Sequence, residues 1–394
     1  MNHKETFYFA GKCLTLDEHP AFGAEILQAI ESGSVNWENF VSLCSDHLIL
    51  PAIYLKFRDH GLLPYLPKEL TKFLSKIHAI NLSRNYKILN QLEEISWLLE
   101  KNGIYPTLLK GAGNLADNLY GNVGERMMRD IDLLVPEQDY LRAALLLENE
   151  GYSTLPHESS DVMKLKHYPS LSRADVFAVV EIHRIPENEQ HIKWYNTQVI
   201  DAEKRKTDQK ASYFVLSDKH KVIHNFIHSQ LSHRGHADGI VSLRDLYDLY
   251  LLSRRISIST TLPFISCKGK ATAYFVFAGK ALGLRKKFSA NEPLGARMLC
   301  LKHDLNHSSA LFYHTYRSAR YLYEKIVFSY CHQIIESFYS KEMRQWVFDR
   351  MKNPHWYKHH VDTYLSFFFP DRKNKNKSTP HLKRRLKYQS HIQK

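Results

Sequence analysis

The chain has 394 residues, 44% of them hydrophobic and 12% aromatic, which is enough to bury more than one packed unit. No apolar run of about eighteen residues and no hydrophobic leader stands in the sequence, which argues against a membrane span and against secretion. Five scattered cysteines without a CxxC pair indicate reduced thiols, so we expect a cytoplasmic protein without disulfides.

The first hundred residues predict helices, because apolar residues recur every three or four positions. The expected ranges are 24–31, 37–46, 50–60 and 67–101. In the last of these, the apolar stripe consists of Tyr86, Leu89, Leu92, Ile95 and Leu99. Such stripes are packing surfaces, and we assign no chemistry to them.

The segment that follows predicts a strand, a tight turn and a helix. Residues 107–109 suit a short strand, Lys110-Gly111-Ala112-Gly113 breaks it, and 112–120 can form a helix. Free amides at a helix start can bind phosphate, and Lys110 adds a positive charge. The GxxxxGK[ST] spacing of a Walker A loop is absent. The alternative is a turn with no ligand.

Residues 128–135, MRDIDLLV, are the most informative stretch of the chain. In a strand, Asp130 and Asp132 project from one face while Ile131 and Leu133 project from the other. Two carboxylates this close repel one another, and a divalent metal ion commonly relieves the repulsion. That arrangement is typical of metal-assisted phosphoryl or nucleotidyl transfer. The alternative is a solvated strand edge or a turn.

A helix over 136–151 and a second strand over 176–184 come next. The strand reads VFAVVEIHR, with Glu181 as its one acidic residue and His183 on the same face. A carboxylate buried without a partner costs several kcal/mol, so Glu181 is a candidate for function. The alternative is an edge strand whose Glu181 meets water.

Two further helices are expected over 219–233 and 242–254. The first carries His224 and His228 one turn apart, but the glutamate of HExxH is missing, so these histidines read as packing residues. The second carries Asp248, which is spaced to pair with Arg244. Asp245 lies nearby and is the alternative candidate for any role given to Asp248. Residues 257–370 predict aromatic-rich helices without a motif.

Three motifs together resemble a known family. They are Leu109-Lys110-Gly111, the block from Arg126 to Val135, and Glu181-Ile182-His183. In type and order they are similar to the bacterial family called uncharacterised nucleotidyltransferase, within the DNA polymerase beta-type superfamily. The resemblance extends from about residue 24 to residue 255. Ala112 and Arg184 depart from the family, which has glycine or serine and tryptophan at these positions.

The resemblance implies an α+β fold, in which a small mixed sheet is flanked by helical N- and C-terminal segments. The expected parts are a helical segment over 1–100, a nucleotidyltransferase core over 101–200, a helical segment over 201–370 and a basic tail over 371–394.

The activity implied is the transfer of a nucleoside monophosphate from an NTP to a hydroxyl or phosphate acceptor. Asp130 and Asp132 would bridge two Mg²⁺ or Mn²⁺ ions, and Glu181 would complete the ion that activates the acceptor. The residues do not identify the acceptor, which could be a small molecule, a sugar phosphate, a protein or an RNA.

The resemblance also implies roles around the metal ions. Lys110 and the Gly111 amide would hold triphosphate oxygens, and Arg126 could neutralise the leaving group. His183 belongs to the Glu-x-His motif, and Asp248 matches an aspartate on a helix that closes over the site. Both are secondary candidates.

The tail over 371–394 holds nine basic residues and one acidic residue and has no core-forming pattern. We expect it to be disordered and to act as a solubilising terminus, although a cationic tail could bind nucleic acid. The competing function is therefore a non-catalytic nucleotide- or nucleic-acid-binding protein with a degenerate nucleotidyltransferase fold. A carboxylate triad argues against it, since binding alone does not need one.

Overall fold

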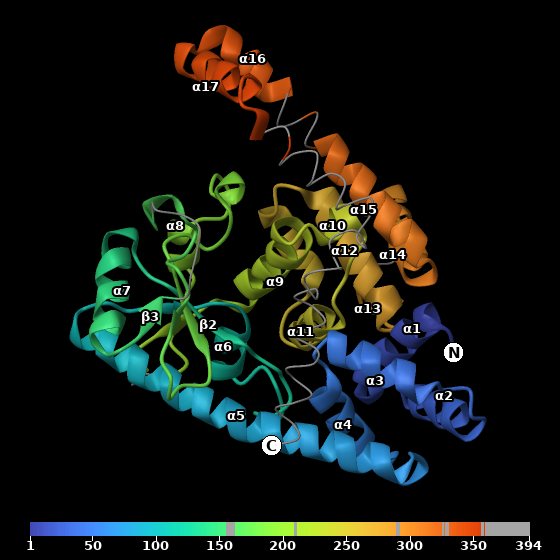
Figure 1. Ribbon diagram of the computed structural model, residues 1–394. Coiled ribbons are helices and arrows are strands. Elements are labelled where there is room, and N and C mark those ends of the chain that lie inside the picture. The colour runs from blue at the N-terminus through green and yellow to red at the C-terminus, as the bar shows by residue number, and fades with distance from the viewer. Residues whose placement is uncertain are drawn as a thin grey trace. The chain divides into compact units, whose positions relative to one another are not determined.

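The computed structural model describes residues 1–154, 162–208, 211–288, 292–324, 327, 331–355 and 358 (Figure 1). It divides into two compact units, Met1–Asp304 and Leu305–Lys394, which are described separately. The first unit contains a small sheet and most of the helices. The expected tail over 371–394 lies outside the described residues, and the expected boundaries after residues 100 and 200 stay predictions.

The sheet of the first unit has six strands in the order β3-β4-β5-β2-β1-β6. Their bounds are β1 Thr107–Leu108, β2 Asp130–Leu134, β3 Ser153–Thr154, β4 Leu171–Ser172, β5 Val179–His183 and β6 Phe214–Val215. The two longest strands, β2 and β5, are parallel neighbours, whereas β1 runs antiparallel to β2. The fold is thus helix-rich with a small mixed sheet, as the α+β expectation required.

Along the chain, helices precede the strands, lie between them and follow them. Those before the strands are α1 His3–Leu14, α2 Pro20–Glu31, α3 Trp37–Asp46, α4 Leu50–Asp59 and α5 Lys68–Lys101. Those between the strands are α6 Lys110–Ala116, α7 Tyr140–Asn149 and α8 Thr197–Asp201. Those after the strands are α9 Asp218–Phe226, α10 Gly235–Asp238, α11 Leu243–Ser253, α12 Lys268–Ala281, α13 Arg285–Phe288 and α14 Leu294–Ser308. Helix α1 lies within the expected helical segment over 1–100, although the sequence analysis gave no separate range for it.

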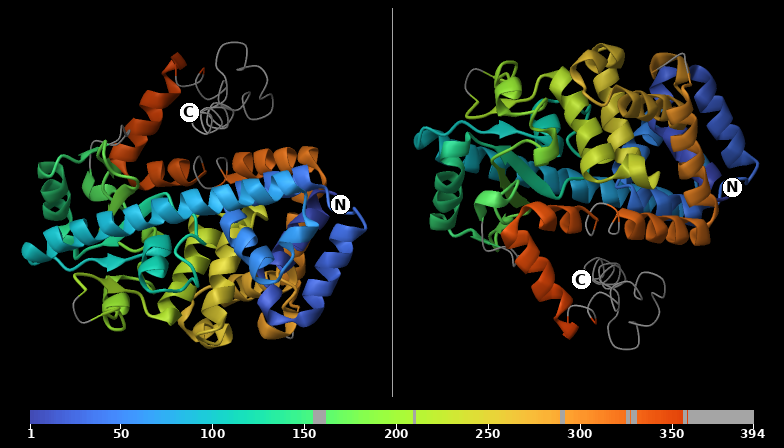
Figure 2. Two further views of the ribbon diagram at one scale, coloured as in Figure 1. Left: turned by 90° about the horizontal axis from the view of Figure 1, so that it is seen from below. Right: turned by 90° about the horizontal axis from the view of Figure 1, so that it is seen from above.

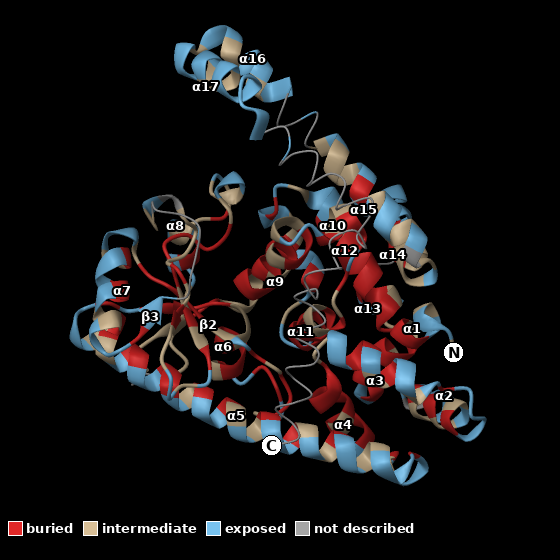
Figure 3. Cartoon of the chain, viewed as in Figure 1, coloured by how far each residue is buried: buried red, intermediate tan, exposed pale blue. Residues whose placement is uncertain are grey.

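The second unit is helical in its described part. Its helices are α15 Ala310–Glu324, α16 His332–Tyr339 and α17 Lys341–Met351. Neither α16 nor α17 has a buried residue, whereas buried residues are frequent in α9 and α11 (Figure 3). Among the described residues, no helix has both the length and the hydropathy needed to cross a bilayer.

Helix α5 is 34 residues long and packs against α4 near its start and against α7 near its end (Figures 1 and 2). The expected apolar stripe is only partly correct, because Tyr86 is 53% exposed. The buried face instead mixes Ile88, Leu92 and Leu99 with the amides of Asn81 and Asn85. Polar residues on a buried face need hydrogen-bond partners, and here the partners belong to the loop before β2.

Two asparagines of α5 bind this loop directly. Asn81 donates to the carbonyl oxygens of Gly124 at 2.7 Å and Arg126 at 3.1 Å. Asn85 donates to the carbonyl oxygens of Val123 at 2.6 Å and Arg126 at 2.8 Å. The loop that leads into the Asp-x-Asp strand is therefore held by buried amides on the long helix.

A close approach of α1 and α12 yields the first prediction. A Cβ on Gly11 would lie 2.1 Å from the carbonyl oxygen of Ala281, so backbone would have to move. We expect Gly11→Ala to lower the free energy of unfolding by about 1–3 kcal/mol, measured by urea denaturation. The control is Gly23→Ala in α2, where nothing lies within 4 Å and a gain of up to about 1 kcal/mol is expected. Equal loss in both variants would contradict this packing argument.

Candidate active site

The register of β2 and β5 brings the candidate carboxylates together. Asp132 pairs with Glu181 across the two parallel strands, and Asp130 pairs with Val179. Directly paired residues share a face of the sheet, as do residues two apart on one strand. Asp130, Asp132 and Glu181 therefore lie on one face. Ile131, on the opposite face, is completely buried, as expected.

Lys110 supplies the positive charge among these acids. Its Nζ lies 2.6 Å from Asp132 Oδ1 and 4.0 Å from Glu181 Oε2. Burial alone would raise the pKa of Asp132, but Lys110 and His183 outweigh it and hold that pKa well below its usual value. Burial and the neighbouring Asp132 carboxylate raise the pKa of Asp130. The environment thus favours the ionised form of Asp132 and disfavours that of Asp130.

Two histidines complete the polar surroundings of these acids. His183 Nε2 is fully buried and lies 3.0 Å from Asp132 Oδ1 and 3.6 Å from Glu181 Oε2. His167 Nε2 lies 3.8 Å from Glu181 Oε2. Burial is the main cause that lowers the pKa of His167. His183, a secondary candidate in the sequence, is therefore at the centre of the cluster, and His167 was missed because its loop has no recognisable pattern.

The donor atoms of this cluster suit a divalent ion. One ligand atom each from Asp132, Glu181 and His183 can be chosen so that all lie within 4.8 Å of one another. Asp132 Oδ2 is buried and has no hydrogen-bond partner among the described residues. A buried carboxylate oxygen left in this state is costly unless a cation binds it. Carboxylate oxygens suit Mg²⁺ and Mn²⁺, and the imidazole nitrogen favours Mn²⁺ of the two.

The turn at Lys110 is conformationally unusual. Lys110 has a φ of 48°, in the left-handed region that side chains other than glycine seldom adopt. Helix α6 begins at this residue, two positions earlier than expected. A Cβ on Gly113 would lie 2.7 Å from the carbonyl oxygen of Leu108, so α6 lies against β1 more closely than a larger residue permits. The strained backbone is held in place by this packing and directs Lys110 toward Asp132.

Arg126 and Asp248 form a buried ion pair. Arg126 Nε donates to Asp248 Oδ1 at 3.0 Å, and Nη2 donates to Oδ2 at 2.9 Å. Tyr120 also donates to Asp248 Oδ1, at 2.8 Å. The spacing in the sequence had pointed to Arg244 as the partner, but Arg244 Nε lies 3.6 Å from Asp245 instead. The pair joins α11 to the loop before β2.

Several of these groups, among them Lys110, Asp130 and Glu181, line a cavity of about 500 Å³ in the first unit, a volume typical of ligand sites. Six residues of the wall are basic. They are Lys110, Arg126, Arg129, Lys166, Lys221 and Arg244. The acidic residues of the wall are Asp46, Asp130, Glu181, Asp245 and Asp248. Gly111 also lines the cavity. A wall with both charges can hold a polyanion together with its counterions.

Sequence reasoning missed four of the basic residues, namely Arg129, Lys166, Lys221 and Arg244. Arg129 stands inside the MRDID motif and could have been noticed there. Arg244 Nε has no hydrogen-bond partner among the described residues, and burial together with Arg126 lowers its pKa. Lys221 differs, since it forms a buried ion pair with Asp117. Arg129 and Arg244 thus add positive charge to the wall of the cavity.

Comparison with known proteins adds one finding to this geometry. Residues 33–261 match a family model described as uncharacterised nucleotidyltransferase. This span is more than half of the chain and includes the sheet, the carboxylates and the cavity. No curated protein matches the chain.

The buried ion pair yields the second prediction. Asp248→Asn removes the charge that compensates the buried Arg126, and breaking such a pair costs about 3–5 kcal/mol. We expect a corresponding fall in the free energy of unfolding, measured by urea denaturation. The control is Asp59→Asn, whose partner Arg58 is exposed, so that a loss below about 1 kcal/mol is expected. A similar small loss for both variants would show that Arg126 does not depend on Asp248.

Proposed function

Since the chain belongs to the uncharacterised nucleotidyltransferase family, we propose that it transfers a nucleoside monophosphate from an NTP to a hydroxyl or phosphate group of an acceptor. The observation that carries the proposal is the pairing of Asp132 with Glu181 across the two strands. Asp130 lies on the same face, and Lys110 forms an ion pair with Asp132. Motif order supports a DNA polymerase beta-type enzyme. Binding alone would not require three crowded carboxylates.

In this proposal Asp130, Asp132 and Glu181 hold Mg²⁺ or Mn²⁺. The bound ion would neutralise phosphate charge and lower the pKa of the attacking hydroxyl. The unpartnered Asp132 Oδ2 supports this assignment, because it is a buried anionic oxygen without a donor among the described residues. His183, which is completely buried, fixes the Asp132 carboxylate through a 3.0 Å hydrogen bond to Oδ1.

The remaining residues of the cavity would bind the triphosphate. Lys110 exchanges its ion pair with Asp132 for a phosphate oxygen, and the Gly111 amide binds beside it. Arg126 is fixed by Asp248 and adds positive charge near the leaving pyrophosphate, together with Arg129 and Arg244. The acceptor oxygen forms a bond to the α-phosphorus, and a hydroxyl acceptor loses its proton to solvent. The bond between the α-phosphorus and the oxygen that bridges to the β-phosphate breaks, and pyrophosphate leaves. In this proposal the basic residues bind the triphosphate, and the acceptor therefore binds near Glu181.

The proposal predicts metal-dependent nucleotide binding. Calorimetry with ATP, CTP, GTP and UTP, each with and without Mg²⁺, should show at least one nucleotide that binds more tightly when the ion is present. The preferred nucleotide would identify the donor. Binding of all four without any effect of Mg²⁺, and without release of pyrophosphate in the presence of candidate acceptors, would contradict catalysis and favour a binding protein.

Variants of the three carboxylates should differ in whether they lose turnover, nucleotide binding or both. We expect Asp130→Asn and Asp132→Asn each to reduce Mg²⁺-dependent turnover by about a hundredfold or more, and Asp132→Asn to abolish Mg²⁺-dependent nucleotide binding. Glu181→Gln should lower turnover more than nucleotide affinity, because its ion serves the acceptor. The control is Glu69→Gln on the exposed surface of α5, which should behave as the unaltered protein. Turnover unchanged in both aspartate variants would refute the assignment.

A further inference from the structure

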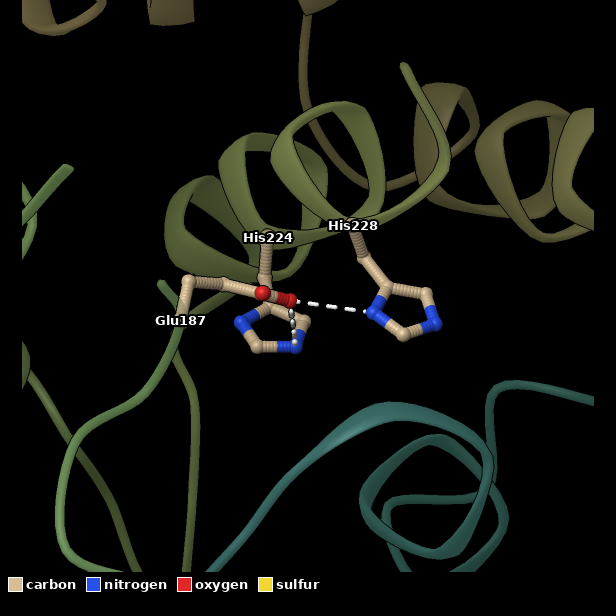
Figure 4. Close-up of side chains that lie close together, drawn as sticks. All are labelled: Glu187, His224 and His228. Atoms are coloured by element: carbon tan, nitrogen blue, oxygen red, sulfur yellow. Dashed lines mark hydrogen bonds and ion pairs between the residues drawn. The ribbon is translucent and has the colours of Figure 1, made fainter. Parts of the chain in front are cut away.

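A second cluster of metal-ligating side chains lies beside the same cavity (Figure 4). It consists of Glu187, which follows β5, His224 on α9, and His228 on the helical turn after α9. Glu187 Oε1 lies 3.0 Å from His228 Nδ1 and 3.5 Å from His224 Nε2. The sequence analysis interpreted both histidines as packing residues, because the glutamate of the HExxH motif is missing from their helix.

The backbone explains why both imidazoles meet Glu187. Helix α9 continues into a π-helical turn, Ile227–Ser232, which contains His228. The two histidines are four residues apart, and their rings lie nearly parallel, with centroids 6.0 Å apart and 10° between the planes. Both rings therefore reach the loop that carries Glu187. Single π-helical turns inside helices occur often at functional sites.

Two of the three ligands, Glu187 and His224, are oriented by a second hydrogen bond. Ser232 Oγ donates to Glu187 Oε2 at 2.7 Å, and Lys166 Nζ lies 3.6 Å from the same oxygen. This leaves Oε1 directed at the two imidazoles. The Tyr195 hydroxyl lies 3.3 Å from His224 Nδ1, so the Nε2 of that ring faces Glu187. Metal-binding histidines and carboxylates are commonly oriented by outer hydrogen bonds of this kind.

An ion pair alone does not account for the cluster. Lys166 and His228 could together neutralise Glu187, but His224 Nε2 would then remain buried without a hydrogen bond. That nitrogen has no hydrogen-bond partner among the described residues, and its side chain is 3% exposed. Such an unpaired buried nitrogen is unfavourable. A bound ion would give this lone pair a partner.

The spacing of the ligand atoms fits a small ion. Ligand atoms bound at about 2.0–2.1 Å to a tetrahedral zinc ion stand about 3.3 Å from one another. The two separations from Glu187 Oε1, 3.0 Å and 3.5 Å, lie on either side of that value. One ligand atom from each of the three residues lies within 4.8 Å of the other two. Small shifts of the side chains would therefore complete three ligand positions.

We propose that Glu187, His224 and His228 bind zinc or a chemically similar divalent transition-metal ion, at a site separate from the carboxylates of β2 and β5. Two imidazoles and one carboxylate favour such ions over Mg²⁺. Three protein ligands leave a coordination position free, and both histidines line the cavity. An oxygen of a substrate can occupy that position. This inference does not depend on the proposed nucleotidyl transfer, since its test measures metal binding alone.

The experiment uses the full-length protein after treatment with a chelator. Zn²⁺ uptake is measured by calorimetry, and Co²⁺ uptake by visible absorption. We expect Glu187→Gln and His228→Ala each to weaken Zn²⁺ binding by about a hundredfold or more, while Asp132→Asn retains it. His228 is 21% exposed, so its replacement should disturb the fold less than that of the fully buried Glu187. The matched control is His332→Ala, since His332 is exposed on α16.

The Co²⁺ spectrum of the unaltered protein gives a second measurement that needs no variant. A four- or five-coordinate ion with nitrogen ligands absorbs strongly in the visible range, whereas a six-coordinate ion bound by oxygen absorbs weakly. Strong absorption that disappears in His228→Ala supports the site. A weak spectrum, Zn²⁺ uptake that persists in both cluster variants, or uptake lost only in Asp132→Asn would overturn the proposal.

Discussion

The parallel pairing of β2 with β5 is the constraint on which the rest of the site depends. It sets Asp132 beside Glu181 in the low-dielectric interior of the sheet, where like charges repel strongly. The strained first residue of α6, Lys110, brings its ammonium to this point, and the buried His183 lies beside the same Asp132 carboxylate. The Lys110 ammonium offsets this repulsion, because it lies within ion-pair distance of both acids.

The sequence predicted the local elements of this arrangement well, because each is a short pattern. The apolar runs around Asp130 and Glu181 are strands, whereas the expected turn over Lys110–Gly113 is already part of helix α6. The small mixed sheet followed from their order and from the family resemblance. The roles given to the individual site residues stay predictions, since position alone does not test them.

Contacts between segments far apart in the chain could not be predicted from the sequence. Arg126 and Asp248 are 122 positions apart, so the nearer Arg244 was the natural partner by helical spacing. Glu187 lies 41 positions before His228 in a loop without periodicity, and a search for HExxH on one helix could not find it. The buried amides of α5 were overlooked for a different reason, because a stripe defined by apolar residues ignores polar ones that are paired across the fold.

Those amides also bear on how the protein can be divided. Asn81 and Asn85 satisfy carbonyl groups of the loop that leads into β2, and a fragment starting at residue 101 would leave these groups to water. The sheet and its acids therefore do not form a transferable module. Recombination or insertion that separated α5 from β2 would remove the scaffold of the acidic strand, so the long helix and the sheet are constrained to be inherited together.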